Sequence, residues 1–181
     1  MFLELIAMRA LSVFVAAVVF SSACVAAEQR WKSNESVDDI NNTQVRTVAV
    51  VAEDGKSVLL LHVEEGKKSK LMLIPKEVMF PDKTDMEAKR MHIEVALRST
   101  KMEKPVSGLW VMPWMDYKTA GAPCSVKAAK EKIFAGESVT VELSKTGKRY
   151  KFPTKGQGCE GLQEAVAKAV EIAAADETAA K

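Results

Sequence analysis

The sequence is poor in the residues that enzymes and metalloproteins most often use for chemistry. Its 181 residues include three cysteines and two histidines, and they contain no C-x-x-C pair, no G-x-S-x-G and no S-x-x-K. Serine and cysteine hydrolases need a histidine placed beside a nucleophile, and no such arrangement is visible. We therefore predict that the protein is not an enzyme and requires no cofactor.

Excess charge of either sign is also missing. The chain has 26 Lys and Arg against 24 Asp and Glu, which leaves a formal net charge of +2 at pH 7. Proteins that bind nucleic acid usually carry a marked basic excess. The composition therefore argues against nucleic acid as an obligatory partner.

Long apolar runs are absent except near the N-terminus. Arg9 precedes an apolar run over residues 10–20, and Val25, Ala26 and Ala27 match a small-residue cleavage site. We expect residues 1–27 to be a signal peptide, with Met8 as the alternative start. The run is too short for a permanent transmembrane helix. The predicted location is the periplasm or the exterior of a Gram-negative bacterium.

The three cysteines also bear on the predicted location of the protein. Cys24 offers an alternative, a lipid-anchored N-terminus, but Ser21 stands where such a site usually has a branched aliphatic residue. Cleavage after Ala27 leaves Cys124 and Cys159 in a compartment that permits disulfides. We predict that these two form a structural bridge, which chain-entropy reasoning values at about 4 kcal/mol.

Short strand patterns dominate the rest of the chain. We expect an extended lead-in over residues 28–44 that Trp31 ties down, one domain over 45–174 and a disordered tail over 175–181. The runs 45–52 and 57–65 flank a turn signal and predict a hairpin. Further strand candidates are 71–74, 78–80, 91–98, 108–114, 138–143 and 148–152, with a helical turn at 128–132. Such a series predicts a mainly β fold, an antiparallel β-sandwich or flattened barrel with one C-terminal helix.

The C-terminal helix has the clearest pattern. Its apolar positions recur at helical spacing along one face: Leu162, Ala165, Val166, Ala169, Val170 and Ala173. Gly156, Gly158 and Gly161 precede it in the spacing of a dinucleotide-binding loop. That fold needs another parallel strand after the helix, and only a polar, alanine-rich tail follows. We therefore interpret the glycines as a turn.

Three groups of residues could form a site. His62 with Glu64 and His92 with Glu94 could hold zinc or a similar ion if their strands are neighbours, although solvent-facing polar residues on half-buried strands are the plainer interpretation of both pairs. Trp110, Met112 and Trp114 share one face of a strand and suit copper(I), a quaternary ammonium group or a sugar, although core packing is the plainer interpretation. The basic residues could bind an anionic surface such as lipopolysaccharide, or protect a solvated edge: Lys145, Lys148, Arg149, Lys151 and Lys155.

The order of several motifs resembles the invasion-associated locus B proteins. It comprises an exported start, an apolar strand ending at Pro75, a cysteine before a short polar segment, a strand opening at residues 136–139, and the closing segment 161–166. The usual early cysteine after the first Trp is missing. The resemblance implies an exported bacterial β-sandwich that acts at the host or envelope interface, and it implies no catalytic residues.

These patterns together favour a non-enzymatic binding protein. Its expected partner is another protein or an anionic component of the envelope or host surface, and the sequence leaves its oligomeric state open. The alternative is a periplasmic carrier of a small ligand or of copper or zinc. An interaction protein needs an exposed apolar or basic patch, whereas a carrier needs a concave site with converging ligands.

Overall fold

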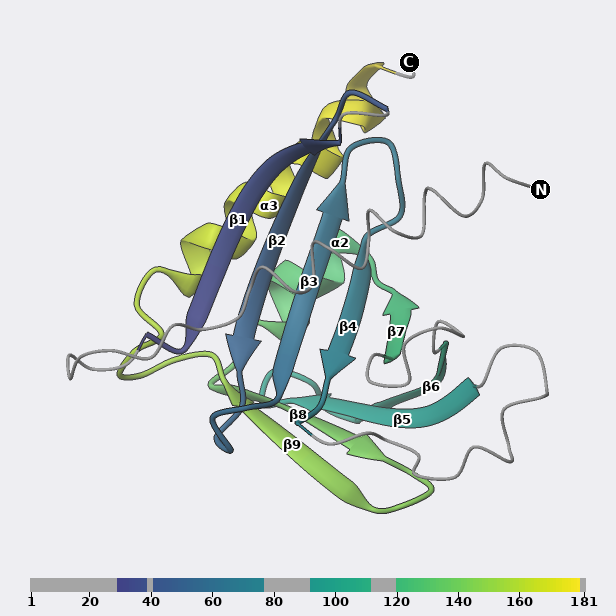
Figure 1. The fold of residues 1–181 in the computed structure, drawn as a ribbon, viewed down its shortest axis with the longest axis vertical. Coiled ribbons are helices and arrows are strands. Elements are labelled where there is room, and N and C mark those ends of the chain that lie inside the picture. The colour runs from purple at the N-terminus through teal and green to yellow at the C-terminus, as the bar shows by residue number, and fades with distance from the viewer. Residues whose placement is uncertain (1–28, 39–40, 77–91, 112–119, 180–181) are drawn as a thin grey trace.

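The computed structural model describes residues 29–38, 41–76, 92–111 and 120–179 (Figure 1). The predicted signal peptide and the predicted strand 78–80 lie outside these residues. The strands are β1 Trp31–Asp38, β2 Thr43–Val51, β3 Val58–Glu64, β4 Lys70–Ile74, β5 His92–Ser99, β6 Val106–Val111, β7 Ala120–Pro123, β8 Ser138–Leu143 and β9 Lys148–Pro153. The helical elements are α2 Val126–Ala128, the π-helical turn η2 Ala129–Ile133 and α3 Leu162–Ala179.

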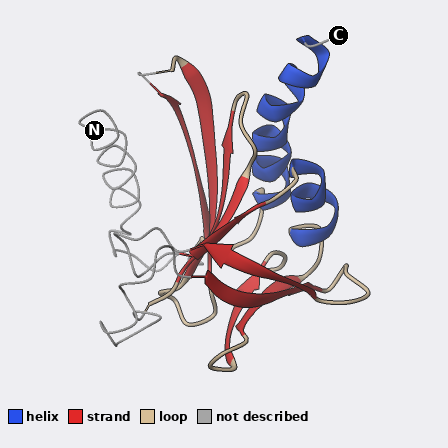
Figure 2. Ribbon diagram, turned by 90° about the vertical axis from the view of Figure 1, so that its right-hand side faces the viewer, coloured by secondary structure: helices blue, strands red, loops and turns tan. Residues whose placement is uncertain are grey.

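The described residues form a mainly β fold, as the sequence predicts, and in them two antiparallel sheets of five and four strands form no closed barrel. The first sheet has the order β1-β2-β3-β4-β7, and the second has the order β6-β5-β8-β9. One backbone pairing, Val111 with Gly121, joins them at the β6–β7 boundary. Figures 1 and 2 show the second sheet crossing the lower end of the first. The two sheets therefore enclose the core from two sides.

Helix α3 closes a third side of the core. It packs on β2 and β3, and Figure 2 shows the helices on one side of the first sheet. Alternation along β2 and β3 turns one set of side chains toward the helix, because successive residues of a strand point to opposite faces. The buried set on these strands and on α3 comprises Val48, Val50, Leu59, Leu61, Val63, Leu162, Val166, Ala169 and Ile172. The predicted helix and its apolar face are therefore confirmed, although Val170 is only half-buried.

Most predicted strands lie where the alternation places them. The expected hairpin forms between β2 and β3, paired from Val45 with Glu64 to Val51 with Val58. Its turn is held by Asp54, whose carboxylate accepts bonds from the Lys56 and Ser57 backbone N–H groups and from the Ser57 hydroxyl. An aspartate that accepts such local bonds is a common turn residue. Strands β4, β5, β8 and β9 likewise match their predicted runs.

Two strands were not predicted as strands. Residues 31–38 of the expected extended lead-in form β1, which pairs with β2 along its whole length. Trp31 fastens its start, because the indole N–H donates to the Glu160 carbonyl oxygen at 2.9 Å. Strand β7 consists of Ala120, Gly121, Ala122 and Pro123, residues with little intrinsic strand preference. It forms because β4 supplies four pairing partners.

Candidate binding sites

The predicted metal site is not assembled. His62 lies on β3 and His92 on β5, and strands β4, β7 and β6 separate them in the sheet order. The two strands are therefore not neighbours, and the premise of the zinc hypothesis is wrong. Glu94 is exposed on β5, away from the His62–Glu64 pair on the other sheet. Within the ranges that the structure describes, no three His, Cys, Asp or Glu side chains gather as metal ligands.

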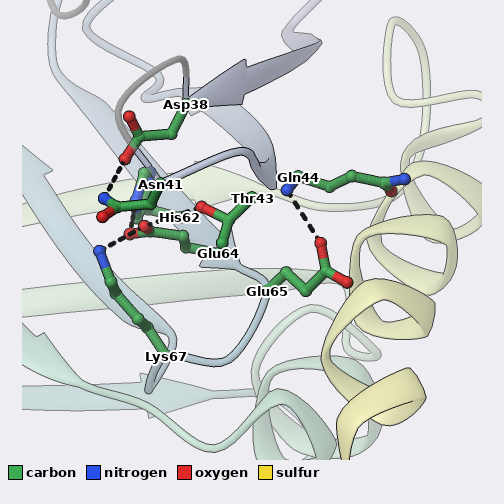
Figure 3. A network of polar contacts seen from close by, with 8 residues as sticks. All are labelled: Asp38, Asn41, Thr43, Gln44, His62, Glu64, Glu65 and Lys67. Carbon is green, nitrogen blue, oxygen red and sulfur yellow. Dashed lines mark hydrogen bonds and ion pairs between the residues drawn. The ribbon is translucent and has the colours of Figure 1, made fainter.

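His62 and Glu64 instead belong to a polar network at one end of the first sheet (Figure 3). The His62 Nε2 and Glu64 Oε2 atoms lie 3.9 Å apart, and Lys67 Nζ lies 2.5 Å from Glu64 Oε1. The Thr43 hydroxyl also donates to Glu64, at 3.3 Å. Burial lowers the pKa of His62 below its usual 6.5, although the nearby Glu64 carboxylate opposes this shift. The network ties the β3–β4 turn to β2.

Trp110 is part of the core. It is 5% exposed and lies opposite Ile93, which is also buried. A large apolar side chain facing the opposing sheet is the ordinary packing role of tryptophan. Met112 and Trp114, the other members of the predicted ligand stripe, lie outside the described residues. The ligand interpretation therefore has no support from Trp110.

The predicted basic cluster is exposed, but acidic side chains neutralise part of it. Arg149 Nε lies 2.6 Å from Glu142 Oε2, and Lys151 Nζ lies 2.7 Å from Glu53 Oε1. Lys148 Nζ sits 5.6 Å from the centre of the Tyr150 ring, a cation–π geometry. Lys145 and Lys155 are exposed as well. This pattern fits a solvated edge better than a concentrated anion-binding surface.

The two remaining cysteines are separate thiols in the structure. Cys124 follows β7, and its Sγ lies 3.4 Å from the Ser125 carbonyl oxygen. Cys159 lies in the turn before α3, with its Sγ 3.5 Å from the Pro153 carbonyl oxygen. Burial raises the pKa of both thiols, which disfavours the reactive thiolate. The structure thus lacks the expected bridge, and pairing in an oxidising compartment stays a prediction.

A hollow of about 370 Å³ lies between β1, β2 and α3. Its charged side chains already have partners in the protein. Arg46 donates to the Lys168 carbonyl oxygen at 2.7 Å and to the Glu35 carboxylate at 2.8 Å. Lys168 Nζ lies 2.7 Å from Glu164 Oε1. These contacts hold α3 against the edge of the sheet, which is a structural role.

The sequence identified Trp110 on β6 as a candidate ligand residue, but it did not identify the exposed side of this strand as a binding surface. Strand β6 pairs with β5 along its whole length, whereas β7 meets its other side at Val111 alone. Among the described strands, none pairs with the other side of β6 over residues 106–110. Val106 is 61% exposed and Leu109 is 65% exposed. Residues 106–111 carry no charge. This feature can be read from the sequence, but by itself it indicates only an ordinary strand.

No described helix is long and apolar enough to span a membrane. Comparison of the chain with protein-family models, curated proteins and solved structures finds no match in any of the three. The resemblance to the invasion-associated locus B proteins therefore stays a prediction.

Proposed function

We propose that the protein is an exported, non-enzymatic binding protein of the bacterial envelope that takes up an extended segment of a protein partner beside β6. The observation that carries the proposal is the uncharged, partly unpaired edge over residues 106–110. Such an edge presents backbone donors and acceptors on its open side, and an added strand can satisfy them. Exposed Val106 and Leu109 supply apolar contacts beside that edge.

The two strands at the ends of the described strand order, β1 and β9, are protected in the usual way. Strand β1 carries Lys32, Glu35 and Asp38, and β9 carries Lys148, Arg149 and Lys151. Charged side chains on an edge discourage pairing with another chain. The Glu53 backbone N–H also bonds to the Lys151 carbonyl oxygen at 2.8 Å, which occupies part of the open side of β9. The contrast singles out β6 as the edge suited to a partner.

The dimensions of this edge favour a short segment. Pro105, which has no backbone N–H, precedes it, and the pairing of Val111 with Gly121 closes its other end. At about 3.4 Å per residue, the open stretch accepts an extended segment of about five residues. Leu109 lies opposite Glu94 and Val106 opposite buried Leu97, so apolar side chains flank both faces of the added strand. The partner segment should therefore be uncharged and apolar.

A peptide library tests this proposal directly. Random heptapeptides displayed on phage are selected against the purified protein, and we expect enrichment of uncharged sequences with apolar residues at alternate positions. The L109K variant should bind a selected peptide at least about tenfold more weakly, because it places a charge beside the added strand. The V37K variant is the matched control, since Val37 is also an exposed apolar residue on an edge strand.

If β6 is the site, L109K weakens peptide binding and V37K leaves it unchanged. Equal loss of binding in L109K and V37K would place the peptide elsewhere. Selection of charged peptides, or of none, would contradict an apolar segment as the ligand. Near-ultraviolet circular dichroism of each variant confirms that a loss of binding does not reflect unfolding.

A further inference from the structure

A second hollow lies at the end of β5 and the start of β8, with a volume of about 410 Å³. Its lining comprises Arg98, Ser99, Thr100, Met102, Ser138 and Thr140. Four of these side chains carry hydroxyl groups, one is a cation, and none is a carboxylate. The volume lies within the range of small-ligand pockets.

Strand pairing brings the cation and the hydroxyl groups together. Arg98 lies directly opposite Thr140, while their neighbours Leu97 and Val141 point into the core. Because alternate residues of a strand face opposite sides, Arg98 and Thr140 share the outer face of the second sheet. Ser138 stands two residues before Thr140 and therefore lies on the same face.

The turn between η2 and β8 holds another hydroxyl in place. The Glu137 backbone N–H donates to Thr100 Oγ1 at 2.7 Å, which leaves the hydroxyl hydrogen of Thr100 available for another acceptor. A Cβ atom at Gly136 would overlap Thr100 Oγ1 and lie 2.7 Å from Ser99 Oγ. Glycine is therefore required at residue 136 for this close approach. The backbone of residues 136 and 137 therefore fixes the position of the Thr100 hydroxyl group.

Arg98 has different surroundings from the basic side chains near it. Arg149 and Lys151, on the same sheet, are paired with Glu142 and Glu53. Within the described part of the chain, no carboxylate lies within ion-pair distance of the Arg98 guanidinium. A guanidinium offers several N–H donors in a planar fork that matches a carboxylate or a phosphate. The hollow thus combines one anion-binding group with hydroxyl groups.

We propose that this hollow binds an acidic saccharide, with Arg98 holding its oxyanion group. The hydroxyl groups of Thr100, Ser138 and Thr140 exchange hydrogen bonds with the hydroxyl groups of the sugar ring, since each can donate and accept. A carboxylate of a uronic acid and a phosphate of a sugar phosphate share this chemistry. The site is distinct from the open side of β6 and does not depend on the proposed peptide binding.

Nuclear magnetic resonance titrations of the isotope-labelled protein test the assignment. The probes are glucuronate, glucose 6-phosphate, inorganic phosphate and glucose. We expect the two acidic sugars to shift the amide signals of Arg98, Ser138 and Thr140, and the stronger of the two identifies the oxyanion that the site prefers. Glucose and inorganic phosphate should bind at least tenfold more weakly, because each lacks one half of the recognised chemistry.

Variants separate this site from general electrostatic attraction. R98Q should weaken binding of the preferred acidic sugar at least tenfold, and T140V should weaken it by a smaller factor. K151Q is the matched control, because Lys151 lies on the same face but is already paired with Glu53. Equal weakening by R98Q and K151Q would overturn the proposal, as would inorganic phosphate binding as tightly as glucose 6-phosphate, or the absence of shifts at these residues.

Discussion

Several side chains whose chemistry would suit a binding site have a structural role in this fold. His62 and Trp110 are the clearest cases, because one closes a polar network and the other fills the core. Both belong to residue types that commonly form binding sites. Their neighbours in space decide their roles, and those neighbours come from distant parts of the chain.

His62 should make stability depend on pH. Its pKa is lowered in the folded protein by burial, while in the unfolded chain it returns to about 6.5. The unfolded chain therefore takes up a proton first as pH falls, so the folded state loses stability on acidification below about pH 6.5. We expect the free energy of unfolding to decrease between pH 7.5 and 5.5, and the H62Q variant to show a smaller decrease. Urea unfolding at both pH values measures the free energy of unfolding of the natural protein and of H62Q.

Carboxylates contribute little to the change in stability between pH 7.5 and 5.5, because most of them titrate at lower pH. The positive charges of Lys67 and Lys70, which lie near His62, add to the lowering of its pKa. An equal loss of stability in H62Q and in the natural protein would show that another group causes the change.

At the scale of elements, helix α3 owes its position to one apolar face. Val166 is fully buried, whereas Val170 on the same helix is only half-buried. The helix contacts β2 and β3. A short helix in water gains most of its stability from such packing rather than from intrinsic propensity.

The substitution V166A should destabilise the protein by about 2 kcal/mol, because it removes buried methyl groups and leaves a cavity. V170A should change stability by less than about 1 kcal/mol and is the control, since both variants gain equally from the helix propensity of alanine. Chemical denaturation midpoints compare the two. Similar losses in both variants would mean that α3 presents a different face to the sheet.

The predicted strands show what periodicity can and cannot locate. Residues 45–52 and 57–65 formed the expected hairpin because alternating apolar residues and a turn-forming Asp54 act locally. Strand β7 was not recognisable, since Ala120 and Gly121 have no strand preference of their own and pair because β4 is beside them. Among the described strands, the lack of pairing along one side of β6 also depends on where β7 lies, which no local pattern reveals.

At the scale of the whole molecule, export and the cysteine pair make one joint prediction. The mature protein should begin at Glu28 and appear in the periplasmic or secreted fraction, because residues 1–27 have the pattern of a cleaved signal. Its intact mass should be lighter by two hydrogens than the reduced chain, because we expect Cys124 and Cys159 to pair in an oxidising compartment. Mass spectrometry with and without reductant measures both.

A lipid-modified mass beginning at Cys24 would contradict soluble export. An unchanged mass on reduction would show that Cys124 and Cys159 remain the separate thiols seen in the structure. A bound metal ion in the native mass would favour the metal-carrier alternative over the binding protein proposed above.

The sequence by itself determined the mainly β class, most strand positions, and the C-terminal helix with its buried face. These features follow from local periodicity and turn chemistry, which nearby residues carry. Only the tertiary structure decided that His62 and His92 lie on different sheets, that no described strand pairs with one side of β6 over residues 106–110, and that Arg98 shares a hollow with four hydroxyl-bearing side chains. Strand order brings those residues together or keeps them apart, and it results from packing of the whole chain rather than from any single stretch.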